Sequence, residues 1–471
     1  MKSAKYKFSR FNYYQKSDYT NSVLIYNSLK RIIIRIDPDE AQQMGIQEDG
    51  PAQEWHEYSF ANGNLEAALI KYGIIVPSTY DENAEAHSRY LEEISSPVLR
   101  LTIVPTYRCN FRCPYCYQDH DGSGIMSQEV QDSIIRFIRK NITNYTAVEI
   151  SWFGGEPLLC MDIILKINSA VKKICNDRFK SFKSSITTNG YCLTKDNFEK
   201  LLEVGVRRYF ITVDGLSQEH DKQRYLANGE GTFQTIINNL KDIRSIPSSR
   251  KFSINIRSNI SKKNINNLQK YLTYMSECFS DDHRFAFFFR RVYDWGGESI
   301  VNFSDNLLED DGDVLVIDEL LKSECQMNYL EFYMDLAGSL VCYASQMNSY
   351  VINPDGSINK CTCADTGGNN AVGKLSLLGD LSLNKSLVGL WCSKYPENTQ
   401  CTNCFFAGIC LRSYCVSNNV MKNSRECNCF SAKNACGKLL LLLDKCDESN
   451  GYIIDMKKNV RILPMENEVL Q

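Results

Sequence analysis

Two kinds of apolar pattern alternate through the middle of the chain. Short runs rich in β-branched and aromatic residues predict strands, and apolar residues at every third or fourth position between them predict amphipathic helices. The expected strands span residues 98–104, 148–153, 183–188, 208–213, 252–260 and 284–292. The clearest expected helices cover residues 128–141, 162–175 and 264–279. Six β/α units predict an α/β fold on a parallel sheet, which we interpret as a partial parallel (β/α)6 barrel, with an open doubly wound sheet as the alternative.

The N-terminal part of the chain predicts a separate small domain. Its pattern indicates two strands around a short turn, at residues 22–26 and 31–36. Two short helices follow, one that begins at Asp37-Pro38 and one at residues 65–76. Two helices and a hairpin favour a winged-helix-like domain. The polar stretch 78–86 predicts the linker that follows it.

The C-terminal part combines many cysteines with turn residues and has little long periodicity. Such a composition is typical of a domain that folds around metal clusters rather than around an apolar core. A five-leucine run within 437–447 predicts a terminal helix that covers an apolar face. The expected domains are therefore a winged-helix-like domain at 1–95, the barrel at 96–300, a bridging segment at 301–341, and a cysteine-rich domain with its helix at 342–471.

Composition excludes several classes of protein. The 471 residues carry a net charge of −3 and a pI near 6.1, which gives no support to nucleic-acid or anionic-membrane binding. No apolar run reaches the roughly 18 residues that a membrane span needs. The start, Met-Lys-Ser-Ala-Lys, is not followed by the apolar segment of a secretory signal, so we expect a cytoplasmic protein.

Cysteine is the unusual residue, with 20 in a chain for which we expect a reducing compartment. Structural disulfides do not persist there, so metal ligation is the leading use for so many thiols. Three cysteines lie between 109 and 116, and most of the others lie beyond 341.

The first cysteine motif directly follows the first expected strand. Cys109, Cys113 and Cys116 have the spacing Cys-x3-Cys-x2-Cys. Three thiolates in one loop can hold three irons of a [4Fe–4S] cluster and leave the fourth iron open to a substrate or cofactor. The alternative is a structural zinc site with His120 as its fourth ligand.

This motif resembles that of the radical S-adenosylmethionine (SAM) superfamily, in which an aromatic residue precedes the third cysteine, as Tyr115 does here. The resemblance implies that the open iron chelates the amine and carboxylate of SAM. It also implies that the reduced cluster cleaves SAM to a 5′-deoxyadenosyl radical, which abstracts a hydrogen atom from the substrate.

Further motifs follow the ends of the next expected strands. Gly154-Gly155-Glu156-Pro157 resembles the family's contact with the methionyl amine, and the segment with Thr188 and Asn189 resembles its contact with the ribose. Asp214, Arg224 and Arg257 are further candidates for SAM contact, with loop capping or a polar pair at the core edge as alternatives. Because active sites of parallel β/α barrels lie at the C-terminal strand ends, these motifs are expected to converge.

The later cysteines resemble the SPASM extension of radical SAM enzymes, although the spacing before Cys415 is one residue longer than is usual there. The resemblance implies two auxiliary [4Fe–4S] clusters. The first would use Cys342, Cys361 and Cys415, with Cys325, Cys363 or an open site completing it. The second would use Cys401, Cys404, Cys410 and Cys429, with Cys427 and Cys436 as alternatives to Cys429. A zinc ribbon built on Cys401 and Cys404 is the competing interpretation.

Together these features predict an enzyme that modifies peptides. SPASM enzymes mostly act on peptides, and the N-terminal domain resembles leader-peptide recognition domains, in which an exposed strand can pair with an extended peptide. We therefore expect a maturase that binds a ribosomal precursor peptide and forms a thioether from a cysteine sulfur to a carbon. A low-potential donor such as flavodoxin or ferredoxin would reduce it. The alternatives are a sulfatase-maturating enzyme, a peptide epimerase or carbon–carbon crosslinking enzyme, and a non-catalytic iron–sulfur or zinc scaffold.

Overall fold

The computed structural model describes residues 5–46, 49–52, 63–118, 124–339, 341–363, 371–392, 399–411, 415–417, 429, 431–447 and 453–456. Its centre is a ten-stranded sheet whose core is parallel. The six expected strands are present as β7 (Val98–Ile103), β8 (Ala147–Trp152), β9 (Ser181–Thr188), β10 (Val206–Thr212), β11 (Ser253–Ile260) and β12 (Phe285–Arg291). Each pairs in parallel with the next along the chain.

This strand order decides between the two predicted topologies. A doubly wound sheet reverses its strand order in the middle, whereas β7 to β12 follow one another without reversal. Because β12 lies at one edge of the sheet, the barrel does not close. The prediction of a partial parallel barrel is confirmed, and the doubly wound alternative is wrong.

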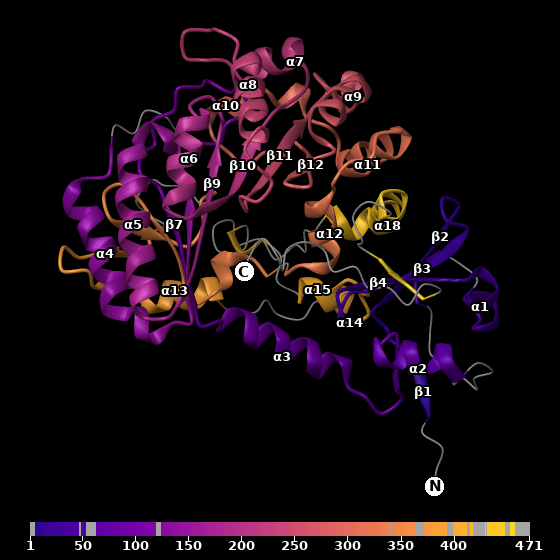
Figure 1. The fold of residues 1–471 in the computed structure, drawn as a ribbon. Helices are drawn as coiled ribbons and strands as arrows, with labels where there is room; N and C mark the ends of the chain where they lie inside the picture. The colour runs from indigo at the N-terminus through magenta and orange to yellow at the C-terminus, as the bar shows by residue number, and fades with distance from the viewer. Residues whose placement is uncertain are drawn as a thin grey trace.

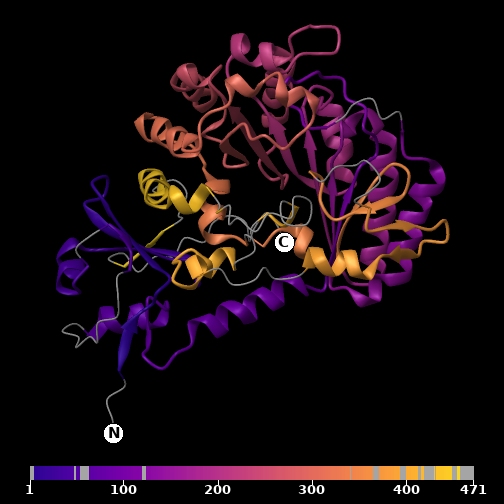
Figure 2. The same cartoon turned by 180° about the vertical axis from the view of Figure 1, so that it is seen from behind.

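Helices cover the outer face of this sheet, as Figures 1 and 2 show. The main ones are α4 (Gln128–Asn141), α5 (Met161–Asp177), α6 (Lys195–Glu203), α7 (Ser217–Gln223), α8 (Phe233–Arg244) and α9 (Leu268–Phe279). Except for α7, whose sequence has no apolar residue, their apolar sides pack on strand residues such as Ile150 and Trp152, which are 1% and 0% exposed. The helix predicted from residue 264 begins at Leu268, because a 3-10 turn, Ile265–Asn267, precedes it.

Part of the cysteine-rich region joins the same sheet, which the sequence did not predict. Strand β13 (Ser349–Ile352) pairs in parallel with β7. The strands β14 (Ser357–Asn359), β15 (Gly373–Leu375) and β16 (Leu381–Leu383) follow it in antiparallel pairing. The division of the chain into domains at residue 341 therefore remains a prediction.

A second sheet forms the centre of the N-terminal region. Its strand order is β17-β4-β3-β2-β5, with bounds Ile454–Asp455, Ile32–Ile36, Ser22–Asn27, Asn12–Ser17 and Gly50–Pro51. The predicted hairpin is confirmed as β3 and β4. Strand β17 comes from the far C-terminal part of the chain and pairs in parallel with β4.

The helices of this region follow the predicted signals in part. Helix α1 (Pro38–Gln43) begins with a capping box in which Asp37 and Glu40 each bond the other's backbone. Helix α2 (Gly63–Lys71) ends earlier than expected, because β6 (Ile75–Pro77) is extended and pairs with β1 (Tyr6–Phe8). The winged-helix-like character of the region remains a prediction.

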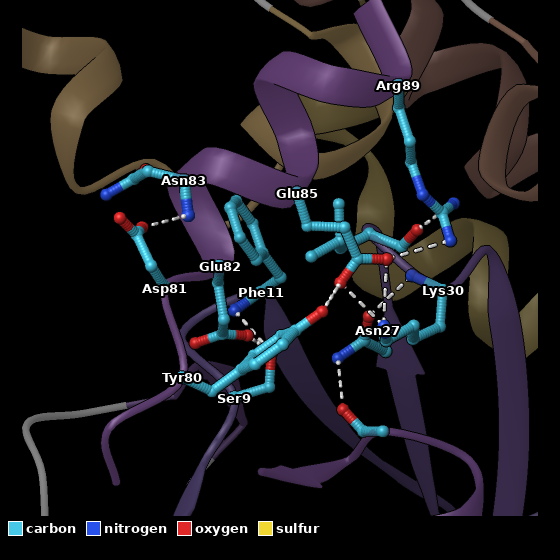
Figure 3. A network of polar contacts seen from close by, with 12 residues as sticks. Ser9, Phe11, Asn27, Lys30, Tyr80, Asp81, Glu82, Asn83, Glu85 and Arg89 are labelled. Atoms are coloured by element: carbon cyan, nitrogen blue, oxygen red, sulfur yellow. Dashed lines mark hydrogen bonds and ion pairs between the residues drawn. The ribbon is translucent and has the colours of Figure 1, made fainter. Parts of the chain in front are cut away.

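The predicted linker is partly helical. Helix α3 (Glu82–Ile94) starts within it, capped by Asp81, and runs toward the barrel (Figures 1 and 3). Glu82 accepts a hydrogen bond from Ser9. Glu85 accepts from Lys30 at 2.8 Å and from Tyr80 at 2.7 Å. These bonds fix the first turn of α3 to the N-terminal region.

The predicted terminal helix is present as α18 (Cys436–Lys445), which buries Leu439, Leu440, Leu442 and Leu443. It packs on α11 (Gly312–Lys322), α12 (Leu330–Ala337) and β2. The shorter helices are α10 (Glu298–Val301), α13 (Lys385–Cys392), α14 (Thr399–Thr402), α15 (Ala407–Cys410) and α17 (Ser431–Asn434). The 3-10 helices besides Ile265–Asn267 are Ile142–Asn144, Pro157–Cys160, Ser304–Asn306 and Tyr343–Ser345. Among the described residues, no helix is both long enough and apolar enough to cross a bilayer.

Candidate functional site

The loop after β7 brings three thiols together. Cys109 and Cys116 both lie close enough to Cys113 to raise its pKa. Burial is the larger cause, and it raises the pKa of Cys109 to about 11 and that of Cys113 to about 12. The loop is held in place by Arg112, whose backbone N–H donates to the Tyr225 carbonyl at 3.0 Å. Its thiols therefore face a site that is poor in water.

Two glycines after β8 let the chain pass against this loop. A Cβ at Gly155 would lie 2.3 Å from the carbonyl oxygens of Tyr107 and Arg108. Gly154 has a φ of +135°, and a Cβ there would lie 2.5 Å from the Thr106 oxygen. The resemblance implied that this motif contacts the methionyl amine of SAM, and glycines allow a close approach of the backbone. In the structure, the close approach is to the backbone that leads into the cysteine loop.

Glu156 joins the ends of β8 and β9. Its carboxylate accepts from the Leu158 N–H at 2.9 Å, the Thr188 hydroxyl at 2.7 Å and the Asn189 N–H at 2.7 Å. Burial raises its pKa, and these donors act against the shift. A carboxylate has about four lone-pair positions, so one position is left for the predicted ammonium group.

Asn189 connects the end of β9 to the cysteine loop. Its side-chain amide donates to the Asn110 Oδ1 at 2.8 Å and lies 4.0 Å from the Cys109 sulfur. The motifs after β7, β8 and β9 therefore meet at one place, as their positions at the strand ends predicted.

A buried polar cluster lies beside the thiols, at the end of β10. Tyr115 donates a hydrogen bond to Asp214, and Arg224 donates to the Tyr115 oxygen at 2.9 Å. The second Asp214 oxygen accepts from the Asn259 N–H at 2.7 Å. Burial raises the pKa of Asp214, while Arg224 and Tyr115 oppose that shift. The sequence placed Tyr115, Asp214 and Arg224 near the site, and the structure brings them together.

Arg257 brings a second positive charge to the same face. Its Nε donates to the Asn259 Oδ1 at 3.0 Å. Burial lowers the pKa of Arg257, and the neighbouring Arg290 lowers it further. Sequence reasoning did not assign Arg290, which pairs with Asp335 on α12. Because Asp335 follows β12 by more than 40 residues, no local pattern indicated that pair.

These residues fit an iron–sulfur cluster and a zwitterionic ligand. The Arg224 Nε is buried and has no hydrogen-bond partner, although Arg224 lies near all three thiols. Thiolates and cluster sulfides are anionic acceptors that such a donor could meet. Arg257 offers a cation to a carboxylate, and Glu156 retains an acceptor position for an amine.

His220 and Asp221 have structural roles. Asp221 caps α8 by accepting from the N–H groups of Thr232 and Phe233 at 2.7 and 2.9 Å. The His220 Nδ1 accepts from the Asp214 N–H at 3.1 Å, so its Nε2 carries the proton and donates to Thr232 at 3.1 Å. His220 and Asp221 therefore bond within the protein, whereas Arg224 from the same segment reaches the thiols.

The buried His220 predicts a loss of stability in acid. Burial lowers its pKa well below the usual value, with Arg224 as a second cause. Below about pH 6.5, His220 is protonated in the unfolded chain but stays neutral in the folded chain. The free energy of unfolding therefore decreases by up to about 1.4 kcal/mol for each pH unit of acidification. We expect His220→Gln to unfold at a lower temperature at neutral pH but to lose less on acidification. Anaerobic thermal melts between neutral and acidic pH test this, and parallel curves for the two proteins would contradict it.

A second group of cysteines lies in the C-terminal region. Cys361 and Cys415 lie close enough to Cys342 to raise its pKa, although burial contributes most. Cys363 interacts with both Cys361 and Cys415. The other candidate for the fourth ligand, Cys325, lies near Tyr329 together with Cys446 instead.

The remaining predicted cysteines are only partly described. Lys433 lies near both Cys404 and Cys429, and its Nζ is 3.6 Å from the Cys429 sulfur. Cys436 is 1% exposed in the core at the start of α18. Cys427 and His120 lie outside the described residues. Among the residues that the structure describes, no three cysteine, histidine or acidic side chains converge on a site for a single metal ion.

Tyr117 lies between the two cysteine groups and contacts the second. No pattern in the sequence indicated this contact. It directly follows Cys116, and its hydroxyl bonds to Cys363. Tyr343, which precedes Cys361 in the chain and contacts Thr362, also lies near Tyr117. The cysteine loop of the barrel is therefore next to the cysteines of the C-terminal region.

Comparisons with known proteins agree with this geometry. Residues 103–257 match the model of the radical SAM superfamily. The chain is 31% identical over 166 residues to a probable GTP 3′,8-cyclase of Methanocaldococcus jannaschii, which covers 34% of this chain and 51% of that protein. It is 29% identical over 189 residues to a cysteine-type anaerobic sulfatase-maturating enzyme of Clostridium novyi, which covers 38% and 47%. The chain thus spans about half the length of these relatives.

Two solved structures share the fold over more of the chain. Native anSMEcpe with bound AdoMet and Cp18Cys peptide has a TM-score of 0.53 at 19% identity and covers 75% of this chain and 97% of its own. Streptococcus suis SuiB bound to precursor peptide SuiA has a TM-score of 0.51 at 15% identity and covers 89% and 97%. The chain contains a radical SAM domain, whose family binds a [4Fe–4S] cluster and SAM.

Proposed function

We propose that this protein is a peptide-modifying radical SAM enzyme that binds a precursor peptide and joins a cysteine sulfur to a carbon atom as a thioether. The observation that carries the proposal is the contact of Tyr117 with Cys363. It places the cysteine loop of the barrel beside the group formed by Cys342, Cys361 and Cys415. Two redox sites that adjoin each other suit a reaction that removes hydrogen from its substrate and must then remove an electron.

Each polar residue of the barrel site has a role in this proposal. Cys109, Cys113 and Cys116 would hold a [4Fe–4S] cluster, and Arg257 would face the carboxylate of SAM. Glu156 would accept from the amine, and Thr188, Asn189 and Asp214 would orient the remainder of SAM. When bound, the cluster and SAM would supply the radical chemistry that removes a hydrogen atom from the substrate. The buried hydrogen bonds from Tyr115 to Asp214 and from Arg224 to Tyr115 hold these side chains in fixed positions.

The C-terminal cysteines supply the electron acceptor. A thioether forms when a carbon loses a hydrogen atom, a thiol loses its proton, and one electron leaves the peptide. Two auxiliary [4Fe–4S] clusters would accept it, one on the group with Cys342 and one on Cys401, Cys404, Cys410 and Cys429. The position of Cys363 supports it over Cys325 as the fourth ligand of the first cluster. A flavodoxin or ferredoxin would reduce the cluster in the barrel.

The N-terminal sheet is the proposed docking place of the leader peptide. Strand β3 is paired on both sides, so it cannot accept another strand. The outer edge of β4 pairs with Ile454 and Asp455 of β17 in parallel. That pairing supports β4 as an edge that accepts an extended segment, and a leader that bound there would displace β17.

Mass spectrometry of an anaerobic reaction tests the proposed function. The enzyme is mixed with SAM, a strong reductant and the cysteine-containing peptide encoded beside its gene. We expect 5′-deoxyadenosine, a peptide lighter by two hydrogen atoms per crosslink, and a matching loss of thiols. Cleavage of SAM with an unchanged peptide would contradict the thioether. Intact SAM would contradict the radical chemistry as well.

A sulfatase-maturating activity is the second candidate, because of the similarity to the Clostridium novyi enzyme. It converts a cysteine or serine to an aldehyde, so an aldehyde-reactive probe would label its product and leave a thioether unlabelled. An epimerised peptide keeps its mass, and a carbon–carbon crosslink keeps its thiols. A non-catalytic scaffold would produce no 5′-deoxyadenosine.

A further inference from the structure

The inner face of the barrel is polar below the cysteine site. Branched apolar side chains usually fill the interior of a parallel barrel. Here the row of Thr102, Ser151, Ser185 and Arg208 crosses four neighbouring strands in register. An inner face of this kind is suited to a polar ligand rather than to a closed core.

A cavity of about 790 Å³ opens on this face and reaches the N-terminal ends of the strands. Six of its lining residues are basic, in a chain whose net charge is −3; they are Lys172, Lys183, Arg207, Arg208, Arg250 and Lys251. Glu149 is the acidic residue of the lining. The cavity is therefore locally positive in a slightly acidic protein.

The protein neutralises this positive charge only in part. Glu149 is paired with Arg100 at 2.9 Å, and Arg208 is paired with Glu331 at 3.0 Å. In the described part of the chain, Lys183, Arg207 and Arg250 have no carboxylate within ion-pair distance. Burial lowers the pKa of Arg207, and the charge of Arg250 lowers it further. An anion between these cations would relieve their repulsion.

A buried amide adds a second observation that points to a ligand. Asn255 is 1% exposed, and neither its Nδ2 nor its Oδ1 has a hydrogen-bond partner. It pairs in register with Phe210, which lines the cavity, so both side chains lie on the inner face. An amide offers both a donor and an acceptor, which are the groups that a peptide backbone requires.

The distance from the cavity to the cysteine site restricts the ligand. Arg208 lines the cavity. Asp214, which lies at the cysteine site, follows it by six positions along β10 and the turn after it. At roughly 3.3 Å per residue, this is about 20 Å. A small anion cannot reach both places, whereas an extended peptide of about six residues can.

We propose that this cavity binds an acidic side chain of the peptide substrate, about six residues from the residue that reaches the cysteine site. The inference rests on the proposed function and narrows it to substrates with an aspartate or glutamate at that spacing. Asn255 bonds the backbone of the segment between the two points.

Peptide binding tests the inference without turnover. The probe is a short fluorescein-labelled glycine–serine peptide with two adjacent glutamates, and its twin carries glutamine in their place. Fluorescence anisotropy with the anaerobically purified full chain measures both. We expect the glutamate peptide to bind at least about tenfold more tightly, and added salt to weaken it.

Two double variants locate the effect. Arg207→Gln with Arg250→Gln is expected to abolish the preference for glutamate. Arg139→Gln with Lys270→Gln removes the same charge from exposed positions on α4 and α9 and should keep the preference. Equal binding of the two peptides, or an equal loss in both double variants, would overturn the inference.

5′-Deoxyadenosine is measured in the same preparations. SAM cleavage without a preference for glutamate would overturn this inference and leave the proposed function in place. A preference that depends on Arg207 and Arg250 but comes with intact SAM would overturn the proposed function, and the cavity would remain an anion site.

Discussion

Replacing Cys113 with alanine should abolish the formation of 5′-deoxyadenosine. The thiol lies near those of Cys109 and Cys116, and alanine has no group that could ligate iron. Two remaining thiolates hold a [4Fe–4S] cluster poorly, so we expect roughly four fewer irons per chain. Because the chemical step depends on that cluster, SAM cleavage should fall by about 10³-fold or more.

The design separates loss of the cluster from loss of the fold. Cys278→Ala is the matched control, because Cys278 is a free thiol on α9 near Lys241 and Tyr274. It should keep full iron content and activity. The C-terminal cysteines should still hold their iron in Cys113→Ala. If Cys113→Ala retained the iron and the activity of the parent protein, the cluster assignment would be wrong.

The strands and the convergence of the motifs were predictable because both depend on local signals. Buried parallel strands are continuous apolar runs, and the residues after each run must meet at one edge of the sheet. Glu156, Asn189 and Asp214 follow the ends of β8, β9 and β10 for this reason, and their contact with SAM remains a prediction. What each side chain binds was less predictable, since Glu156 accepts three bonds from the protein itself.

Strands that are defined by their pairing rather than by an apolar run were missed. Strand β2, Asn12–Ser17, has no apolar run, and its pairing with β3 holds it extended. Strand β17 has two residues and is defined only by its pairing with β4. The predicted linker, residues 78–86, includes the start of helix α3, where no apolar residue is buried; the buried apolar residues of the helix, Tyr90 and Ile94, come later.

The contact between the two cysteine groups could not be predicted from the sequence either. Tyr117 is an unremarkable residue in the printed chain, and Cys363 lies more than 240 residues away. Their contact follows from β13, which pairs with β7 and brings the C-terminal region to the barrel. The same pairing explains why a cysteine-rich segment with little periodicity contains strands.

Replacing Asp444 with alanine should detach the N-terminal sheet from the terminal helix. The buried carboxylate of Asp444, on α18, accepts from Ser17 at 2.5 Å, from Thr20 at 2.8 Å and from the Arg35 Nε at 3.0 Å. Its removal takes away the acceptor that Ser17, Thr20 and Arg35 share and leaves Arg35 with the weaker contact to Asp447 at 3.2 Å. Breaking a buried ion pair from one side typically costs about 3–5 kcal/mol.

Amide hydrogen exchange shows which part of the protein loses stability. In Asp444→Ala, amide protons of β3 and β4 should exchange faster, while those of the barrel strands should not change. Asp318→Ala is the control. It removes the exposed ion pair between Asp318 on α11 and Lys438, which lies on α18 like Asp444. Such a pair is worth about 1 kcal/mol or less. If both variants exchanged like the parent protein, the Asp444 cluster would not hold the two parts together, and other contacts, such as the hydrogen bond from Tyr26 to the Leu336 carbonyl, would have to do so.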